Sequence, residues 1–297
     1  MRQKKTQPIV LVILGPTASG KSDLAVKIAK KVNGEIISAD SRQVYKGLDI
    51  GTGKITTEEM QGVPHHLIDV CSPKKVFTVA EYQKMALQKI EEILNRGHVP
   101  ILAGGTGFYI DAVTRGIILP EVPPDKALRK KLESLSDEAL FAHLLRIDKD
   151  RARAIKLKNE IRNRVRLIRA IEVATALGQV PKIKHKKLPY TFVQIGVAVD
   201  EEKLKQKIAR RVAIMFEEGL LEEIEKLKKQ GVSKKRLREF GFEYNEPTLE
   251  SVITESYKYV KRQMTWFRRH KDIIWLSPDQ VVAFATANLT KVSKIPR

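Results

Sequence analysis

Residues 15–22 read Gly15-Pro16-Thr17-Ala18-Ser19-Gly20-Lys21-Ser22, and this stretch decides the fold. It has the pattern G-x-x-x-x-G-K-[ST], and it follows an apolar run, residues 9–14, that predicts a buried parallel strand. The residues after Ser22 repeat apolar side chains at helical spacing. A glycine-rich loop between a strand and a helix can wrap an anion with its backbone N–H groups, and Lys21 adds a full positive charge. The sequence therefore predicts a phosphate-binding loop, with Ser22 placed to bind a magnesium ion.

The segments around this loop alternate between predicted strands and predicted helices. They cover residues 9–14, 23–32, 35–39, 79–96 and 99–103. This alternation predicts an α/β fold, in which a P-loop parallel sheet is flanked by helices on both faces. Ligands of such sheets bind outside the carboxyl ends of the strands. We therefore expect the phosphate loop, Asp40 and Thr106, each of which follows a strand, to converge at one edge.

A helical insertion is expected to interrupt the sheet domain. The prolines of residues 119–124 mark a boundary, and residues 120–189 then show helical patterning with little strand character. Lys and Arg outnumber Asp and Glu by 18 to 9 over residues 121–190, so the insertion is basic. Strand character returns at residues 192–199. The prediction is a P-loop core of residues 1–119 and 190–297, a helical insertion of residues 120–189, and two late helices near residues 201–230 and 249–270.

Composition restricts the class of protein. The 297 residues are 42% hydrophobic, and no stretch approaches the ~18 consecutive apolar residues that span a bilayer, so no membrane segment is expected. The single cysteine, Cys71, excludes an internal disulfide and fits a reducing cytoplasm. The net charge of +20 indicates a polyanionic partner, because phosphate neutralisation releases counterions. A basic surface that serves only solubility is the alternative.

Three short segments contain candidate chemistry whose role the residues alone leave open. Asp40, at a strand's carboxyl end, could hold magnesium, accept a proton from a nucleophile, or merely form a turn. Residues 51–54 read Gly-Thr-Gly-Lys, which either brings Lys54 or backbone amides near an anion or forms a surface turn. Asp69 follows a strand-like run and could belong to a magnesium shell.

Basic and glycine-rich segments suggest contacts with a nucleic acid. The loop Gly104-Gly105-Thr106-Gly107 offers close backbone approach and one hydroxyl. Helical spacing would place Arg162, Arg166 and Arg169 on one face, where they could follow a phosphate backbone or form salt bridges within the protein. Residues 261–270 combine cations, an amide and aromatic rings, which suits unstacked RNA bases, although the aromatics could equally belong to the core.

Taken together, these blocks make the chain resemble the tRNA dimethylallyltransferases, also called tRNA isopentenyltransferases. The resemblance covers most of the chain, and it rests on the order and spacing of residues 15–22, 36–45, 49–54, 62–69, 104–107, 168–173 and 261–267. It implies that the loop holds dimethylallyl diphosphate rather than a nucleoside triphosphate. It further implies that the acceptor is N6 of the adenosine 3′-adjacent to the anticodon, in tRNAs that read codons beginning with U.

The resemblance also implies roles for individual residues. Asp40 corresponds to the carboxylate that takes the N6 proton, and Thr106 to a hydroxyl near the transferring centre. The residues expected to bind the diphosphate are Gly15, Thr17, Ala18, Ser19, Gly20, Lys21, Ser22 and Arg211, with Mg²⁺ on Ser22. Those expected to face the anticodon stem-loop of the tRNA are Asp40, Ser41, Arg42, Gln43, Thr106, Arg166, Arg169, Lys261, Arg262 and Gln263. A monomer is expected.

The chain also departs from the family pattern, and other functions use similar motifs. Ser256 and Tyr257 replace a usual Thr-Arg pair, Phe240-Gly241-Phe242 replaces Ile-Gly-Tyr, and an arginine is missing near Asp200. A small-molecule kinase or nucleotide hydrolase would share the loop but would not explain the charge of +20. An isopentenyltransferase for free adenine nucleotides would not need the basic insertion. A non-catalytic RNA-binding module would not need intact Lys21, Ser22 and Asp40.

Overall fold

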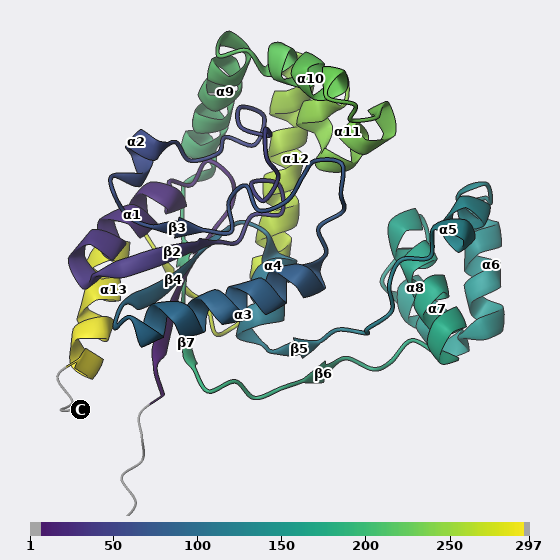
Figure 1. Cartoon of the computed structure of the whole chain (residues 1–297), viewed down its shortest axis with the longest axis horizontal. Helices are drawn as coiled ribbons and strands as arrows, with labels where there is room; N and C mark the ends of the chain where they lie inside the picture. The colour runs from purple at the N-terminus through teal and green to yellow at the C-terminus, as the bar shows by residue number, and fades with distance from the viewer. Residues whose placement is uncertain (1–6, 294–297) are drawn as a thin grey trace, which may run out of the picture. The chain divides into compact units, whose positions relative to one another are not determined.

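A six-stranded parallel sheet forms the centre of this computed structural model, which describes residues 7–293, with side chains through Leu289 (Figure 1). The strand order is β3-β2-β4-β1-β7-β8, and each neighbouring pair is parallel. The strands are β1 (Ile9–Leu14), β2 (Gly34–Ser38), β3 (His65–His66), β4 (Val99–Gly104), β7 (Thr191–Val197) and β8 (Ile274–Leu276). The expected α/β class with a parallel sheet is confirmed. In register, Leu11 of β1 lies opposite Ile101 of β4 and Val193 of β7, so β1 is a central strand.

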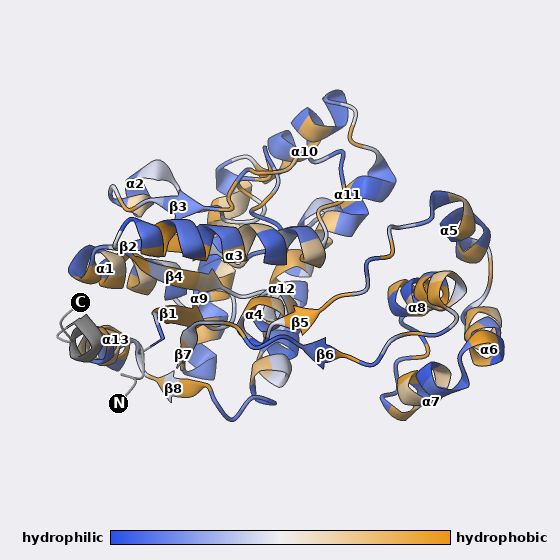
Figure 2. Cartoon of the chain, turned by 60° about the horizontal axis from the view of Figure 1, so that its bottom comes forward, coloured by the Kyte–Doolittle hydropathy of each residue, from blue (hydrophilic) through white to orange (hydrophobic). Residues whose placement is uncertain are grey.

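Both faces of the sheet are covered by helices, because alternate residues of the central strands point to opposite sides. Val10, Val12 and Leu14 pack with α3 (Val79–Asn95), α4 (Gly107–Thr114) and Phe267. Leu11 and Ile13 pack instead with α1 (Lys21–Val32) and α13 (Pro278–Ser293). Figure 2 shows the same division, with hydrophobic residues along the central strands and hydrophilic residues on the outer side of α3. The phosphate loop is thus mounted between a strand and a helix that are both buried in the core.

A second helical group lies beside the carboxyl end of the sheet in the same unit. It contains α9 (Glu201–Glu217), α10 (Leu220–Lys229), α11 (Lys234–Phe240), a 3₁₀ turn at Phe242–Tyr244, and α12 (Leu249–Phe267). The prediction of a single helix over residues 201–230 is wrong. Gly219 adopts a φ of 97°, which a continuing helix does not allow, so α9 ends and α10 begins around it. The short helix α2 (Thr57–Met60) belongs to this unit as well.

The insertion is a separate compact unit. The chain divides into one unit that contains the described residues up to Gly116 and those from Lys187 onward, and a second that spans Ile117–Lys186. Its helices are α5 (Lys126–Glu133), α6 (Asp137–Ile147), α7 (Lys149–Leu157) and α8 (Arg164–Leu177), and the short strands β5 (Ile117–Ile118) and β6 (Lys184–His185) pair antiparallel. Leucine and isoleucine side chains of α6, α7 and α8 form its own core. Within the described part of the chain, no helix has the length and apolar character that a membrane span requires.

Candidate active site

The phosphate loop closes tightly between β1 and α1. Ala18 and Gly20 have φ values of 59° and 82°, which turn the backbone into the first turn of the helix. Lys21 Nζ folds back and donates to the Pro16 carbonyl at 3.2 Å. The Ser19 hydroxyl is buried, and no described residue accepts or donates a hydrogen bond to it. Gly15 lies so close to Ser19 that an added Cβ would come within 3.1 Å of its Oγ. The loop therefore leaves the Ser19 hydroxyl without a partner among the described residues, next to a helix N-terminus, where an anion is favoured.

Lys21 is a cation held in an unfavourable environment. Burial lowers its pKa from 10.5 to about 8, Asp40 acts in the opposite direction, and Arg211 lowers it further. The charged form of a buried amine is stabilised when a compensating anion comes close. An anionic ligand beside Lys21 would supply that compensation.

Asp40 and Thr106 lie in the loops that follow β2 and β4, and Thr106 lines neither of the two cavities described below. Asp40 Oδ1 accepts hydrogen bonds from the backbone N–H groups of Arg42 at 2.9 Å and Gln43 at 3.3 Å, which fixes the orientation of the carboxylate. The Thr106 hydroxyl accepts from the Ser41 N–H at 3.0 Å and donates to the Ser41 hydroxyl at 3.3 Å. Thr106 is the residue before α4, yet its side chain makes no capping bond to that helix. The two loops that follow these strands are thereby tied together.

Gln263 of α12 joins the phosphate loop to the loop after β4. Its Oε1 accepts from the Thr17 N–H at 3.0 Å, and its Nε2 donates to the Gly105 carbonyl at 2.9 Å. The side chain is buried, and a Cβ on Gly105 would lie 2.5 Å from Nε2. The sequence placed Gln263 among the tRNA-facing residues, whereas the structure shows its amide bonded to two loops of the protein.

Two adjoining cavities open onto these groups and share Thr17, Asp40, Thr52 and Arg211. One is also lined by Lys21, Ser22 and Gln43, and it is therefore the phosphate-loop cavity. The other is also lined by Gly51, by the apolar and aromatic side chains of Ala18, Ile208, Val212, Met215, Phe242 and Tyr259, and by the polar side chains of Arg42, Glu243 and Ser256. The structure thus brings the predicted Thr17, Ala18, Lys21, Ser22, Asp40, Arg42, Gln43 and Arg211 together.

Arg42 sits in an aromatic and acidic enclosure that sequence patterns did not indicate. Its Nη1 lies 2.5 Å from Glu243 Oε2, and its guanidinium carbon lies 5.2 Å from the ring centre of Phe242 and 5.4 Å from that of Tyr259. Burial raises the pKa of Glu243, and Arg42 opposes this rise. Because Arg42 and Glu243 are about 200 residues apart in the chain, no local spacing could have revealed the pair.

The loop of residues 48–54 lines both cavities through Thr52, and it supports Arg211. Arg211 Nη2 donates to the Thr52 carbonyl at 2.9 Å. Lys54 Nζ contacts Asp49 and Asp69 at 2.5 Å each. The sequence suggests Asp69 for a magnesium shell at the end of a strand, but β3 ends at His66, and Asp69 lies in a bend with φ 55° beside Lys54. The carboxylate is paired within the protein and lines neither cavity.

The other basic residues predicted to face tRNA lie on α12 and, in the insertion unit, on α8. Lys261 and Arg262 are exposed on α12, where their cationic groups lie 4.7 Å from the ring of Tyr257 and 5.6 Å from that of Tyr259. The Tyr257 hydroxyl contacts Glu201, so two segments that depart from the family pattern touch each other.

Arg166 and Arg169 belong to the insertion unit. Arg166 forms an ion pair with Glu160, and Arg169 Nη2 donates to the Val122 carbonyl at 2.8 Å. The third arginine of the expected row, Arg162, precedes the helix, because α8 begins at Arg164. The expected single face of three arginines is therefore wrong, and each of the other two already has a partner inside the insertion.

The chain is similar in sequence to a family of known enzymes. The family model described as IPP transferase matches residues 43–270. The tRNA dimethylallyltransferase of Acetivibrio thermocellus is 41% identical over 292 residues, with 91% of this chain and 92% of that protein covered. The tRNA dimethylallyltransferase of Staphylococcus carnosus is 40% identical, with 92% of each chain covered.

Solved structures of proteins with similar names also match this chain in fold. The full-length tRNA isopentenylpyrophosphate transferase of Bacillus halodurans matches with a TM-score of 0.70 and 37% identity, over 98% of this chain and 99% of that one. A eukaryotic dimethylallyltransferase, described as acting on tRNA, matches with a TM-score of 0.73 and 26% identity, over 97% of this chain and 78% of that one.

Proposed function

This chain belongs to the family of tRNA dimethylallyltransferases, which are prenyltransferases that modify tRNA, and from this premise we propose its reaction in detail. The chain transfers a dimethylallyl group from dimethylallyl diphosphate to N6 of the adenosine 3′-adjacent to the anticodon. Its substrates are tRNAs that read codons beginning with U. The observation that supports this most directly is the pair of adjoining cavities that share Asp40 and Arg211.

The two cavities suit the two substrates. Lys21, Ser22 and the backbone of the phosphate loop surround the cavity that would take the diphosphate. Phe242, Tyr259 and neighbouring apolar side chains line the second cavity, which suits either a flat aromatic base such as adenine or the branched five-carbon allyl group. Asp40 lines both, so a donor in one cavity and an acceptor that reaches the other can meet at one carboxylate.

The transfer exchanges one bond for another at the allylic carbon. The bond from that carbon to the diphosphate oxygen breaks as its bond to N6 forms, and the N6 proton passes to Asp40. Negative charge builds on the leaving diphosphate, where Lys21, Arg211 and the loop N–H groups stabilise it. An amine attached to a purine is a weak nucleophile, so a carboxylate in hydrogen-bond reach assists C–N bond formation. Thr106 holds the Ser41 backbone and so keeps the Asp40 turn in place.

The oxygen donors of the site fit a magnesium ion. Ser22 lines the phosphate-loop cavity, and its hydroxyl oxygen is a ligand that Mg²⁺ favours. Among the described residues, no cluster of three His, Cys, Asp or Glu side chains could hold a metal, which suits an ion carried mainly by phosphates and water. When bound, the ion would neutralise charge on the diphosphate.

Each unit contributes residues that we propose to contact tRNA. The net charge of +20 and the basic insertion provide the attraction for phosphates. The set proposed to face tRNA comprises Asp40, Ser41, Arg42, Gln43, Thr106, Arg166, Arg169, Lys261 and Arg262. Gln263 is assigned instead to holding the phosphate loop. Extrusion of the adenosine from its stack is required, because a stacked base hides the edge that carries N6.

The decisive experiment follows radiolabel from dimethylallyl diphosphate, with magnesium, into unmodified tRNA. AMP and ATP serve as parallel acceptors, and nucleoside digestion locates the label. Label on N6 of the adenosine next to the anticodon of U-reading tRNAs is the expected result. Label in AMP or ATP alone would assign the chain to free-nucleotide prenylation, and ATP hydrolysis without any label would contradict the proposal.

The Asp40→Asn variant tests the proposed proton acceptor. Asparagine keeps an oxygen that can accept from the Arg42 and Gln43 N–H groups, so the turn should persist while the basicity is lost. We expect kcat to fall by about 10²–10⁴, with tRNA binding unchanged. Asp279→Asn, an exposed carboxylate on α13, is the matched control. Activity near that of the control would exclude Asp40 as the base.

A further inference from the structure

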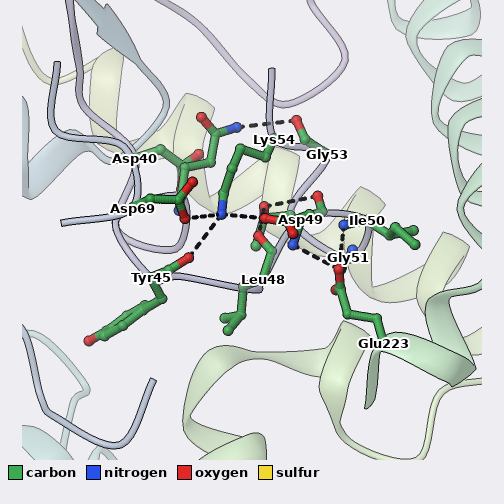
Figure 3. Close-up of polar contacts among 12 residues, drawn as sticks. Asp40, Tyr45, Leu48, Asp49, Ile50, Gly51, Gly53, Lys54, Asp69 and Glu223 are labelled. Carbon is green, nitrogen blue, oxygen red and sulfur yellow. Dashed lines mark hydrogen bonds and ion pairs between the residues drawn. The ribbon is translucent and has the colours of Figure 1, made fainter. Parts of the chain in front are cut away.

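The carboxylate of Glu223, on α10, is an internal anion held by the loop of residues 48–54 (Figure 3). Its Oε2 accepts from the backbone N–H groups of Asp49 at 2.8 Å and Ile50 at 2.7 Å. Its Oε1 accepts from the Gly51 N–H at 3.1 Å and from the Tyr244 hydroxyl at 2.8 Å. Successive N–H groups that converge in this way form an anion-binding concavity. The sequence suggested that backbone amides of residues 51–54 could lie near an anion. The structure shows an anion at the Gly51 amide, and it is the Glu223 carboxylate of the protein itself.

The loop has little freedom to move once Glu223 is in place. A Cβ on Gly51 would come within 2.7 Å of the Tyr244 ring and 2.9 Å of Leu220, so backbone and helix are in close contact there. At the other end, Lys54 Nζ binds Asp49, Asp69 and the Tyr45 carbonyl, and its side chain is only 7% exposed. The loop is therefore anchored on both sides of Thr52.

Between these anchors, the loop meets Arg211. The Thr52 carbonyl accepts from Arg211 Nη2 at 2.9 Å, and the Thr52 hydroxyl donates to the Leu48 carbonyl at 2.7 Å. Gly53, with φ 51°, lies directly against the guanidinium, because a Cβ there would be 2.0 Å from Nη2. Arg211 in turn lines both cavities. A displacement of residues 49–51 would therefore move the surface that orients Arg211.

We propose that Glu223 is a positioning residue for prenyl transfer, which acts through residues 49–53 to hold Arg211 against the departing diphosphate. The inference rests on the proposed function, in which Arg211 binds the diphosphate. Glu223 itself touches neither cavity. Glu223 would contribute by preorganisation. When the Arg211 guanidinium is already in place, no free energy is spent on ordering it as negative charge develops on the diphosphate.

The test is a double-mutant cycle between Glu223→Gln and Arg211→Gln in the full chain. The probe is inorganic diphosphate with magnesium, measured by calorimetry, together with kcat and KM for transfer from dimethylallyl diphosphate to tRNA. We expect Glu223→Gln to weaken diphosphate binding about tenfold, to lower kcat, and to leave the KM for tRNA unchanged. In the Arg211→Gln background the same substitution should change diphosphate binding less than twofold. Glu225→Gln, an exposed carboxylate on the same helix paired with Lys228, is the matched control.

Each outcome has a distinct meaning. Equal losses from Glu223→Gln in both backgrounds would show general destabilisation and overturn the inference, as would no loss in the wild-type background. If Arg211→Gln alone leaves diphosphate binding intact, the placement of Arg211 in the proposed function is wrong, and the inference fails with it.

A second pair of variants keeps the test open if Glu223→Gln does not fold. Glu223→Asp keeps the charge but is shorter, and Tyr244→Phe removes one donor from the carboxylate. Both should fall between wild type and Arg211→Gln in diphosphate affinity, and both should lose their effect in the Arg211→Gln background. Effects that persist in that background would overturn the inference.

Discussion

Lys21 shows how a single residue couples burial to ligand binding. Its amine is buried beside Asp40 and Arg211, and burial holds its pKa at about 8. A bound diphosphate favours the charged amine, so the pKa must rise on binding. Between the two pKa values the complex carries a proton that the free protein lacks, and binding is accompanied by proton uptake.

The affinity for inorganic diphosphate should therefore fall as pH rises above about 8. The free protein then has neutral Lys21, and the decrease attributable to this residue is at most about tenfold per pH unit. Calorimetry in two buffers of different ionisation enthalpy, at constant magnesium, would measure the proton uptake directly. Lys21→Arg is the matched control, because arginine stays charged and diphosphate's own titration is common to both proteins. Identical pH profiles for the two proteins would contradict the prediction.

At the scale of elements, α12 connects the loops that form the site. Gln263, on its buried face, bonds to the phosphate loop and to the loop after β4. Further along the helix, Trp266 Nε1 donates to Asp111 of α4 at 2.9 Å, and a Cβ on Gly107 would lie 2.4 Å from its ring. The same helix carries exposed Lys261 and Arg262 on its other side. One helix therefore combines internal support with a cationic surface.

Replacement of Gln263 by leucine should separate these two roles. Leucine fills the space but leaves the Thr17 N–H and the Gly105 carbonyl without partners, so we expect a loss of about 1–3 kcal/mol in unfolding free energy. Diphosphate affinity should fall, since the loop loses its tie, while tRNA affinity should not. Urea unfolding and calorimetry would measure both effects. Gln206→Leu, at an exposed position of α9, provides the control, and equal behaviour of the two variants would refute the assignment.

A cluster of hydrogen bonds around Glu35 joins β2 to its neighbours, away from the catalytic edge of the sheet. Glu35, on β2, is only 3% exposed. Its carboxylate accepts two hydrogen bonds from Arg96, at 2.7 and 3.0 Å. A ring nitrogen of His66 and one of His98 each lie 2.6 Å from the same carboxylate. Burial acts to raise its pKa, but the hydrogen bonds from Arg96, His66 and His98 prevail and lower the pKa to about 2. The cluster links β3 and the end of α3 to β2.

This cluster predicts the acid sensitivity of the fold. Because the folded pKa lies below the unfolded value of about 4.5, the stabilisation is complete above pH 4.5 and is lost as pH falls toward 2. The expected contribution is on the order of 3 kcal/mol. Urea unfolding between these pH values should show a steeper decline for wild type than for Glu35→Gln. Glu91→Gln, at an exposed position of α3, should follow wild type, and parallel curves for all three would disprove the role.

At the scale of the whole molecule, the surface charge is expected to attract tRNA, and the buried groups of the phosphate site are expected to bind the diphosphate. The excess of cations is distributed over the chain and is dense in the insertion, whereas the phosphate site relies on a few buried groups. Exposed charges are screened by salt and buried ones much less. The two substrates should therefore respond differently to ionic strength.

Doubling the salt concentration should weaken tRNA binding by roughly tenfold, for about four to five phosphate contacts, and weaken diphosphate binding far less. Filter binding across a salt series would give the slope for tRNA. Arg166→Ala should reduce that slope by about one, because it removes one phosphate contact. Val165→Ala, on the same exposed turn, should leave the slope unchanged. Salt dependence of the same size for both ligands would contradict this division.

Features that depend on neighbouring residues could be predicted from the sequence. An apolar strand, a glycine-rich turn and an amphipathic helix predicted the phosphate loop, and strand–helix alternation predicted the parallel sheet, because these features depend on residues within a few positions of one another. Polar residues after strand ends also indicated which edge would hold the site, since parallel strands share one carboxyl edge.

Only the tertiary structure decided which distant residues support that site. Glu223 and residues 49–51, Gln263 and Thr17, and Arg42 and Glu243 are each separated by more than 170 residues in the chain. Their bonds arise from the packing of α10 and α12 and the 3₁₀ turn against the sheet edge, and no local period records such a pairing. For the same reason, Lys54 and Asp69 looked like ligands for an anion and a metal, whereas folding had already paired them with each other.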